Sequence, residues 1–487
     1  MTYGDLDALV GRVAAGFVGI GVTPGERVAW FLPNSLEAVV ATLACYRIGA
    51  VSVPVNYRYV APEVQYVIER TTPRVLVFHE DRAEVVRLVA DVVGGLSRVV
   101  VGSEEVGRSF LPWSTLVADT VLRGAAALEE SAPALILFTS GSTGHPKGVT
   151  HSHRSAWHAI DNSREALDIR ADDVVLVGKP ISHAGGLHTQ LLPTLMVGGQ
   201  VILSMKPTPE SASELIVREG VSQYGMLASD LLDFVEYLEE SGVRLPSLRN
   251  SIGSGDSVAF ELHHRFRDLF GWEVLEGCGM TEIGCYYAMN PRYGRRKWGS
   301  LGLPTPRTEL RVTGDDGREV AKGAIGEIVV RTPSATIGYW RNPAATAGLF
   351  RDGWLRTGDL GRFDEDGYLW FVGRQKLMIV RRGSNIAPAE VENVLDEHPQ
   401  VHASVVVGVA DRRDGSIPVA WIMPMHDADA PDVDALRAYV STRLAPYQSP
   451  VHYLFIRDLP RNSTGKFDRY RLQALAVKEL GGKAGEE

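Results

Sequence analysis

The chain has 487 residues, a length that suggests about three domains or fewer large ones. Apolar residues make up 45% of it and charged residues 22%, as in an ordinary soluble globular protein. The net charge of −9 disfavours a nucleic-acid-binding protein with a dominant basic field. Three cysteines, Cys45, Cys278 and Cys285, are too few for a disulfide framework, so we expect a reducing compartment.

Neither the amino terminus nor the apolar segments indicate export or membrane insertion. Residues 1–5 contain no basic segment followed by an apolar core, so no secretory signal is expected. The most apolar stretch, residues 191–205, is interrupted by Pro193, Gly198 and Gly199 and cannot supply an unbroken span of about 20 residues. We therefore expect a cytoplasmic protein without a transmembrane segment.

Helical and extended patterns alternate in the first part of the chain. A helix is expected after the capping pair Asn34-Ser35. The expected helices span residues 36–47, 62–70 and 84–93, and the expected strands span residues 51–55, 74–78 and 98–101. Valine-rich strands that alternate with helices predict parallel sheets covered on both faces.

The pattern changes after Gly302. Residues 309–312 and 326–331 are predicted to form hairpin strands around the turn at residues 314–317. Further helices are expected at 388–397 and 433–444, and strands at 404–409, 419–423 and 451–456. These elements suffice for a small α+β domain, so we divide the chain into domains 1–375 and 376–487.

The sharpest local feature is a loop rich in Gly, Ser and Thr. An apolar strand at residues 135–138 leads into it, and it ends in Pro146-Lys147-Gly148. Glycines let backbone N–H groups turn inward and hydroxyl groups add donors, so the loop can wrap phosphate oxygens. Pro146 excludes a Walker A loop, which needs Gly before its Lys. An ordinary flexible turn is the weaker alternative.

At this loop the chain resembles the adenylate-forming (ANL) superfamily, which includes the acyl-CoA synthetases. Residues 2–7 look like the family's opening segment, and residues 276–282 look like its Tyr-Gly-x-Thr-Glu motif. The other matching segments, in family order, are residues 326–331, 338–340, 353–359, 373–376 and 462–466. One such match would be weak, but this many in order cover nearly the whole chain.

The resemblance implies a fold and a reaction. The fold is a large N-terminal α/β body of stacked sheets and helices plus a distorted barrel, with a small mobile α+β C-terminal domain. The reaction activates a small carboxylic acid with ATP to an acyl-adenylate, and coenzyme A then takes the acyl group. It requires positioning and electrostatic stabilisation rather than a covalent nucleophile. ATP, Mg²⁺ and coenzyme A are therefore the expected cofactors, and a homodimer is an open possibility.

The resemblance also assigns roles to residues of the N-terminal domain. Glu282, together with Thr139, would hold Mg²⁺, and Thr281 would contact the α-phosphate. The phosphate-binding residues would be Thr139, Ser140, Gly141, Ser142, Thr143, Gly144 and Lys147. The rest of the nucleotide site would be formed by Gly255, Asp256, Gly277 and Cys278.

The remaining roles fall late in the chain. Asp359 would accept both ribose hydroxyls, with Arg374 alongside. Lys466 would bridge the substrate carboxylate and the α-phosphate, and Lys376 matches the hinge about which the small domain swings. Arg381-Arg382 is equally compatible with coenzyme A phosphates and with a solvated pair.

Two positions depart from the family pattern. Cys278 replaces an aromatic residue that packs against adenine, a loss on the order of 1 kcal/mol. Asp256 lies in a segment that is usually small and neutral. It could accept from the adenine amino group, reach the acyl pocket or simply close a turn, and these alternatives stay open.

The acid and its acceptor are argued from further residues. His183 stands where amino-acid-activating relatives carry the aspartate that pairs with the substrate ammonium, so we favour a fatty or aryl acid without an α-amino group. Met226 and Trp157 are possible pocket walls, although core packing is preferred for Trp157. Coenzyme A is the favoured acceptor. The alternatives are an acyl-AMP ligase that loads a carrier protein and a nucleotide-binding module without catalysis.

Overall fold

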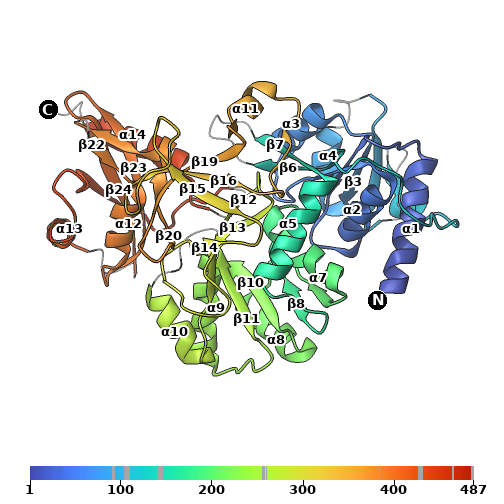
Figure 1. The fold of residues 1–487 in the computed structure, drawn as a ribbon, viewed down its shortest axis with the longest axis horizontal. Coiled ribbons are helices and arrows are strands. Elements are labelled where there is room, and N and C mark those ends of the chain that lie inside the picture. The colour runs from blue at the N-terminus through green and yellow to red at the C-terminus, as the bar shows by residue number, and fades with distance from the viewer. Residues whose placement is uncertain are drawn as a thin grey trace. The chain divides into compact units, whose positions relative to one another are not determined.

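The computed structural model describes residues 1–89, 94–103, 110–139, 146–254, 258, 260–382, 384–425, 431–462 and 466–483 (Figure 1). The chain forms two compact units. Unit 1 comprises Met1–Leu310 and Val330–Leu355, and unit 2 comprises Arg311–Val329 and Arg356–Glu487. The predicted α/β class, with a large N-terminal body and a smaller C-terminal α+β part, is confirmed.

The first sheet of unit 1 has eight strands in the order β17-β7-β6-β2-β1-β3-β4-β5. Strand β1 pairs in parallel with β2 and with β3, β3 pairs in parallel with β4, and β2 pairs in parallel with β6. Strand β7 pairs antiparallel with both β6 and β17. The strands are β1 (Arg27–Phe31), β2 (Val51–Pro54), β3 (Val75–His79), β4 (Ser97–Val101), β5 (Leu111–Pro112), β6 (Pro133–Thr139), β7 (Lys147–Ser152) and β17 (Gly338–Tyr339).

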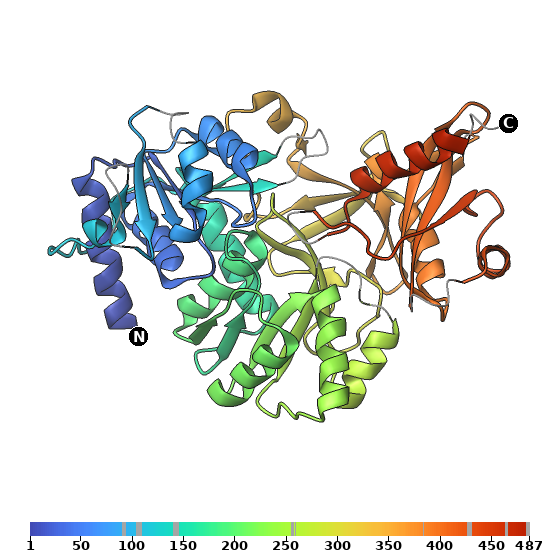
Figure 2. The same cartoon turned by 180° about the vertical axis from the view of Figure 1, so that it is seen from behind.

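Different helices cover the two faces of this sheet, as Figure 2 shows from behind. Side chains of α1 (Tyr3–Gly19) and α2 (Leu36–Ile48) share one core with Val28 and Trp30, and those of α3 (Ala61–Thr71) and α4 (Ala83–Leu88) share another with Ala29 and Phe31. Successive strand residues point to opposite faces, so β1 serves both cores. This confirms the prediction of a sheet covered on both sides.

The predicted elements of this region are confirmed, with one error of length. Ser35 caps α2 by accepting a hydrogen bond from the backbone N–H of Ala38 at 3.3 Å. The helix predicted at 84–93 is shorter, because the chain leaves helical geometry at Val89 (φ −109°, ψ 9°). Its β-branched residues favour a helix only weakly. Residues 90–93 lie outside the described chain.

The second sheet has seven strands in the order β14-β13-β12-β11-β10-β8-β9. Strands β8 to β12 are parallel, and β13 returns antiparallel to β12. The strands are β8 (Val174–Val177), β9 (Gln200–Leu203), β10 (Gln223–Leu227), β11 (Asn250–Ser254), β12 (Leu275–Met280), β13 (Cys285–Met289) and β14 (Leu303–Pro304). The helices of this region are α5 (His153–Ala166), α6 (Ala184–Gly186), α7 (Leu192–Val197), α8 (Pro209–Glu219), α9 (Ala228–Ser241) and α10 (Phe260–Phe270).

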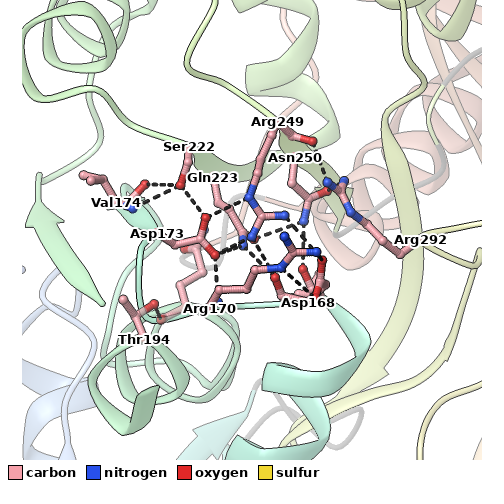
Figure 3. Close-up of polar contacts among 12 residues, drawn as sticks. Asp168, Arg170, Asp173, Val174, Thr194, Ser222, Gln223, Arg249, Asn250 and Arg292 are labelled. Atoms are coloured by element: carbon pink, nitrogen blue, oxygen red, sulfur yellow. Dashed lines mark hydrogen bonds and ion pairs between the residues drawn. The ribbon is translucent and has the colours of Figure 1, made fainter. Parts of the chain in front are cut away.

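A buried polar network ties together the amino ends of β8, β10 and β11 (Figure 3). Asp173, which is 2% exposed, accepts from Ser222 Oγ at 2.6 Å, Gln223 Nε2 at 2.8 Å and Arg249 Nε at 2.9 Å. Burial acts to raise the pKa of Asp173, but these donors outweigh it and the pKa is lowered. The network fixes the register of the three strands and leaves their carboxyl ends free for a site.

A third, five-stranded sheet has the order β15-β16-β19-β18, with β20 beside β19. Its strands are β15 (Glu309–Thr313), β16 (Gly326–Arg331), β18 (Phe350–Arg351), β19 (Trp354–Phe363) and β20 (Leu369–Arg374), and α11 spans Pro343–Ala347. The division of the chain into units falls inside β15, β16 and β19. The two predicted hairpin strands, 309–312 and 326–331, are confirmed as β15 and β16.

The C-terminal sheet of unit 2 has the order β22-β21-β24-β23, with β25 parallel to β24. Its elements are β21 (Ile379–Arg381), β22 (Ser384–Ile386), α12 (Pro388–Asp396), β23 (Val401–Asp411), β24 (Gly415–Pro424), α13 (Val433–Ser441), β25 (His452–Phe455) and α14 (Arg469–Lys483). Helices α12 and α13 pack on one apolar cluster of the sheet and α14 on another. All five elements predicted here are confirmed. No helix in the described ranges is long and apolar enough to span a membrane.

Candidate active site

The predicted phosphate loop is closed by a β-hairpin. Thr139 is the last residue of β6 and pairs in register with Lys147, the first residue of β7. Sequence analysis placed Lys147 in the loop, whereas the structure places it in the strand. The loop residues Ser140, Gly141, Ser142, Thr143 and Gly144 lie outside the described residues. The hairpin therefore holds the two ends of the loop one strand spacing apart.

Thr281 and Glu282 occupy the turn of a second hairpin. Strands β12 and β13 pair antiparallel up to Met280 and Cys285, so residues 281–284 form the tip. Gly284 has φ +75°, and a Cβ there would lie 3.0 Å from His151 Cε1. Glycine is required by both the left-handed backbone and the close packing. The tip thus presents Thr281 and Glu282 in a fixed geometry.

Two fully buried histidines form hydrogen bonds with the backbone of this tip. His151 Nε2 donates to the carbonyl oxygen of Thr281 at 2.8 Å, and His188 Nδ1 donates to that of Gly284 at 3.2 Å. Burial lowers the pKa of His151 to about 4 and that of His188 to about 3, so both rings are neutral near pH 7. Sequence reasoning missed both residues, and no local pattern marks them.

Tyr339 links the two hairpins. It lies in the family-matched segment 338–340, but sequence analysis assigned it no role. It pairs with Val149 of β7, and its hydroxyl donates to Glu282 Oε1 at 2.8 Å. Lys147 Nζ lies 4.9 Å from the centre of its ring, a cation–π distance. Burial, and next the Glu282 carboxylate, raise the pKa of Tyr339, so the phenol is a permanent donor. Tyr339 thus joins the base of the loop to the predicted metal ligand.

The segment that follows the carboxyl end of β8 forms a third part of the candidate site. Asn34 holds the segment after β8: its Nδ2 donates to the carbonyl oxygen of Lys179 at 2.9 Å, and its Oδ1 accepts from the N–H of Ile181 at 2.9 Å. His183 follows in this segment, and its surroundings, chiefly by desolvation, lower its pKa to about 4. Its Nε2 atom is buried without a partner among the described residues. A neutral ring with an unused nitrogen suits a pocket residue.

The late site residues gather within unit 2. Asp359 of β19 is 6% exposed and pairs in register with Arg374 of β20, whose Nε lies 3.0 Å from Asp359 Oδ1. Burial raises the pKa of Asp359, and Arg374 and then Lys466 oppose the shift. The structure therefore brings Asp359, Arg374 and Lys466 into one electrostatic cluster. Lys376 lies on an exposed short 3₁₀ turn (Gln375–Leu377) just after β20.

Some of the remaining predicted residues lie on described strands and helices, and others lie outside the described residues. Gly277 and Cys278 lie on β12, where Cys278 Sγ is 3.0 Å from the hydroxyl of Tyr287. Gly255 and Asp256 lie outside the described residues. The preferred reading of Trp157 as a core residue is wrong, because its position on α5 leaves it 52% exposed.

Arg381 and Arg382 both form ion pairs with Asp414, although the side chain of Arg382 is 72% exposed. Arg381 Nε donates to Asp414 Oδ2 at 2.8 Å and Arg382 Nε to Asp414 Oδ1 at 2.6 Å. Hydrogen bonds from Arg381 and then Arg382 lower the pKa of Asp414. A contact of these arginines with coenzyme A stays a prediction.

Comparison with known proteins adds independent information. Residues 1–340 match the family model described as AMP-binding enzyme, and residues 390–466 match that of the AMP-binding enzyme C-terminal domain. Feruloyl-CoA synthase of Amycolatopsis sp is 35% identical over 468 residues, which cover 96% of this chain and 92% of that protein. The fatty acid–[acyl-carrier-protein] ligase ScoC of Streptomyces coeruleorubidus is 32% identical over 486 residues, which cover 97% and 91%.

Solved structures share the fold. The crystal structure of the anthranilate CoA ligase AuaEII in complex with anthranoyl-AMP has a TM-score of 0.90 to this chain at 25% sequence identity. The match covers 99% of this chain and 93% of that one.

Proposed function

This chain belongs to the AMP-binding enzyme family, and from that membership we propose that it is an ATP-dependent carboxylic acid–CoA ligase. The substrate carboxylate attacks the α-phosphate of ATP, which forms an acyl-adenylate and releases pyrophosphate. The thiol of coenzyme A then attacks the acyl carbon, and AMP leaves. The acid is a fatty or aryl acid that lacks an α-amino group, because His183 offers no anionic partner to an ammonium group.

The proposal assigns the adenylation step to four residues. Thr281 contacts the α-phosphate, Glu282 serves the metal-bound phosphates, and Lys466 bridges the substrate carboxylate and the α-phosphate. His183 lines the acid site as a neutral ring. Adenylation requires that two anions be held together, and cationic and hydrogen-bonding groups offset their repulsion.

The nucleotide contacts follow the same logic. Asp359 accepts the ribose hydroxyls while Arg374 orients its carboxylate. The loop from Thr139 to Lys147 binds the outer phosphates, and Gly277 and Cys278 flank the adenine. Asp256 and Gly255 belong to the same side of the nucleotide in this proposal.

The residues present suit a magnesium ion. Glu282 is half-buried, and among the described residues only Tyr339 hydrogen-bonds its carboxylate, through Oε1, so Oε2 is available to a hard cation. In the described part of the chain, no three His, Cys, Asp or Glu side chains gather into a metal site of their own. Mg²⁺ would therefore be held jointly by Glu282, Thr139 and the phosphates, and would offset the phosphate charge.

The observation that carries the proposal is the hydrogen bond from Tyr339 to Glu282. It links the hairpin that closes the Gly/Ser/Thr loop with the hairpin that presents Thr281 and Glu282, which supports a shared role of the two hairpins in binding the phosphates and the metal. The test is pyrophosphate release and AMP formation with a panel of fatty, aryl and dicarboxylic acids, with and without coenzyme A. A complete absence of acid-dependent pyrophosphate release would instead support a nucleotide-binding module without catalysis.

A second candidate is an acyl-AMP ligase that loads a carrier protein. It is favoured by the similarity to ScoC, whose name describes a fatty acid–[acyl-carrier-protein] ligase. Incubation with coenzyme A alone separates the two candidates. The first predicts a CoA thioester, and the second predicts acyl-AMP that accumulates until a carrier protein is added.

Three further expectations belong to this proposal. The chain works as domains 1–375 and 376–487, with Lys376 as the hinge between half-reactions. A homodimer is possible and is tested by light scattering. Cysteines 45, 278 and 285 are free, which suits a cytoplasmic location that cell fractionation tests.

A further inference from the structure

Lys179 is a buried cation without a described counter-charge. It lies two residues beyond the carboxyl end of β8 and is 7% exposed. Its Nζ donates to Ser254 Oγ at 2.6 Å, and Ser254 Oγ in turn donates to the carbonyl oxygen of Met226 at 3.3 Å. Within the described ranges, no carboxylate lies at ion-pair distance from Lys179. Lysine is almost never buried in this way unless it is paired.

A second buried polar side chain, Gln190, lies beside Lys179. A Cβ added to Gly225 would lie 2.7 Å from Gln190 Nε2 and 3.5 Å from Lys179 Nζ, so both side chains reach the same point of β10. Gln190 is 4% exposed, and its Oε1 has no partner among the described residues. Such a cluster at the carboxyl ends of parallel strands is where open α/β sheets bind ligands.

The position of Lys179 is fixed before any ligand binds. Asn34 holds the Lys179 carbonyl oxygen at 2.9 Å and also donates to the carbonyl oxygen of Ser204 at 2.9 Å. The ammonium group is therefore presented by a rigid backbone and oriented by Ser254. A group that is preorganised in this way loses little entropy when it meets a ligand.

Strand register separates Lys179 from the reacting end of the site. Gly253 pairs with Glu276, so Ser254 is level with Gly277, whereas Thr281 lies in the turn that follows the end of β12 at Met280. The three strand steps from Gly277 to Met280 alone span about 10 Å. A carboxylate that reacts beside Thr281 is thus too far away to be the partner of Lys179. The partner must come from the other end of the acid.

From this placement we infer that the enzyme takes an acid with a second oxyanion, a carboxylate or a sulfonate, at the end distant from the reacting carboxylate, and that Lys179 pairs with it. The inference rests on the proposed ligase function and narrows its substrate class. A neutral chain end would leave the buried ammonium unpaired, whereas an oxyanion neutralises it.

The test compares matched acids that differ only in the distal group. The pairs are octanoate with suberate, and cinnamate with 4-carboxycinnamate; 4-sulfocinnamate and 4-hydroxycinnamate complete the series. The readout is kcat/KM for acid-dependent pyrophosphate release. A charge-assisted hydrogen bond predicts a preference of about tenfold or more for the charged member of each pair. The carboxylate and sulfonate arms identify which oxyanion is used.

The variant Lys179→Met removes the charge at similar size. It should abolish the preference for the charged acid and raise kcat/KM for the uncharged acid. Lys179→Gln should have the same effect and replaces the Met variant if that variant folds poorly. The matched control is Lys206→Met, because Lys206 is an exposed lysine on the loop after β9. It should keep the wild-type preference. Loss of an unpaired buried charge should also leave the melting temperature of the free Lys179→Met enzyme equal to or above that of the wild type.

Several outcomes would overturn the inference. An equal fall of kcat/KM for both members of each pair in Lys179→Met would assign Lys179 to the reacting end or to the nucleotide. A preference for 4-hydroxycinnamate over both neighbours would make the partner a neutral acceptor. A wild type confined to monoacids, together with an Asp256→Asn variant that accepts diacids, would identify Asp256 as the counter-ion. Absence of pyrophosphate release with every acid would refute the ligase proposal itself, whereas activity without these charge effects would refute only the role of Lys179.

Discussion

The two buried histidines under the Thr281–Glu282 tip should make the enzyme sensitive to acid. His151 and His188 have pKa values of about 4 and about 3 in the folded chain, against an ordinary value of 6.5. Because burial depresses the pKa, the unfolded chain binds these protons first as the pH falls. Stability is therefore full above about pH 6.5 and is lost as the pH falls from there towards the folded pKa values.

The magnitude follows from proton linkage. At pH 5 each histidine lowers the free energy of unfolding by about 2 kcal/mol relative to pH 7, since one pKa unit corresponds to about 1.4 kcal/mol. The pair thus contributes a loss of about 4 kcal/mol, a large part of the stability of an ordinary domain. The variant His188→Gln removes one titrating ring and keeps an amide that can donate to the Gly284 carbonyl oxygen.

The assay is urea unfolding followed by tryptophan fluorescence at pH 7, 6 and 5, with reversibility checked by dilution. The difference in the free energy of unfolding between pH 7 and pH 5 should be about 2 kcal/mol smaller in His188→Gln than in the wild type. His402→Gln, at an exposed position of unit 2, is the matched control and should leave the difference unchanged. If His188→Gln shows the same loss between pH 7 and pH 5 as the wild type, His188 does not remain neutral in the folded chain.

Three further substitutions test other parts of the structure. Tyr339→Phe removes only the hydroxyl that donates to Glu282, a hydrogen bond to a charged group that is worth about 1.5–3 kcal/mol, so kcat/KM for pyrophosphate release should fall about tenfold to a hundredfold with an unchanged circular dichroism spectrum. Asp173→Asn should lower the free energy of unfolding by about 2 kcal/mol at pH 7, less than for a fully buried pair because Arg249 is 27% exposed. Because the pKa of Asp173 is lowered, the variant should also lose less stability than the wild type as the pH falls below 3.8, and urea titrations at pH 7 and pH 3 measure both effects. Lys466→Ala should abolish acid-dependent pyrophosphate release and spare thioester formation from supplied acyl-AMP, and an equal loss of both steps would contradict the role given to Lys466.

Elements with strong local signals could be predicted from the sequence. Helix α2 begins at the capping residue Ser35, and β2, β3 and β4 are short apolar runs with clear boundaries. Helix α1 carries a comparable signal, since Thr2 and Asp5 form a capping box. Its outer residues are exposed, so hydrophobic periodicity alone marks it weakly.

The site was predictable only where a motif is contiguous. Thr281 and Glu282 could be named because they are adjacent in the sequence, and Asp359 and Arg374 because each lies in its own motif. The contacts of His151, His188 and Tyr339 depend on pairing between distant strands. His151 lies 130 residues from Thr281, and Tyr339 lies 57 residues from Glu282. Local propensity contains no information about such register, which tertiary packing decides.

The coupling of the two hairpins explains how the ends of the predicted phosphate loop and the predicted metal ligand Glu282 are held together although they belong to different sheets. Thr336, which is 3% exposed, donates through its backbone N–H to the carbonyl oxygen of Glu282 at 2.7 Å and through its hydroxyl to that of Thr150 in β7 at 2.5 Å. Tyr339 makes the parallel connection through side chains. Because backbone and side-chain links act together, displacement of either hairpin breaks buried hydrogen bonds, each of which is costly to lose. The short segment that ends in β17 therefore connects the two hairpins of the candidate site, although β17 itself has two residues.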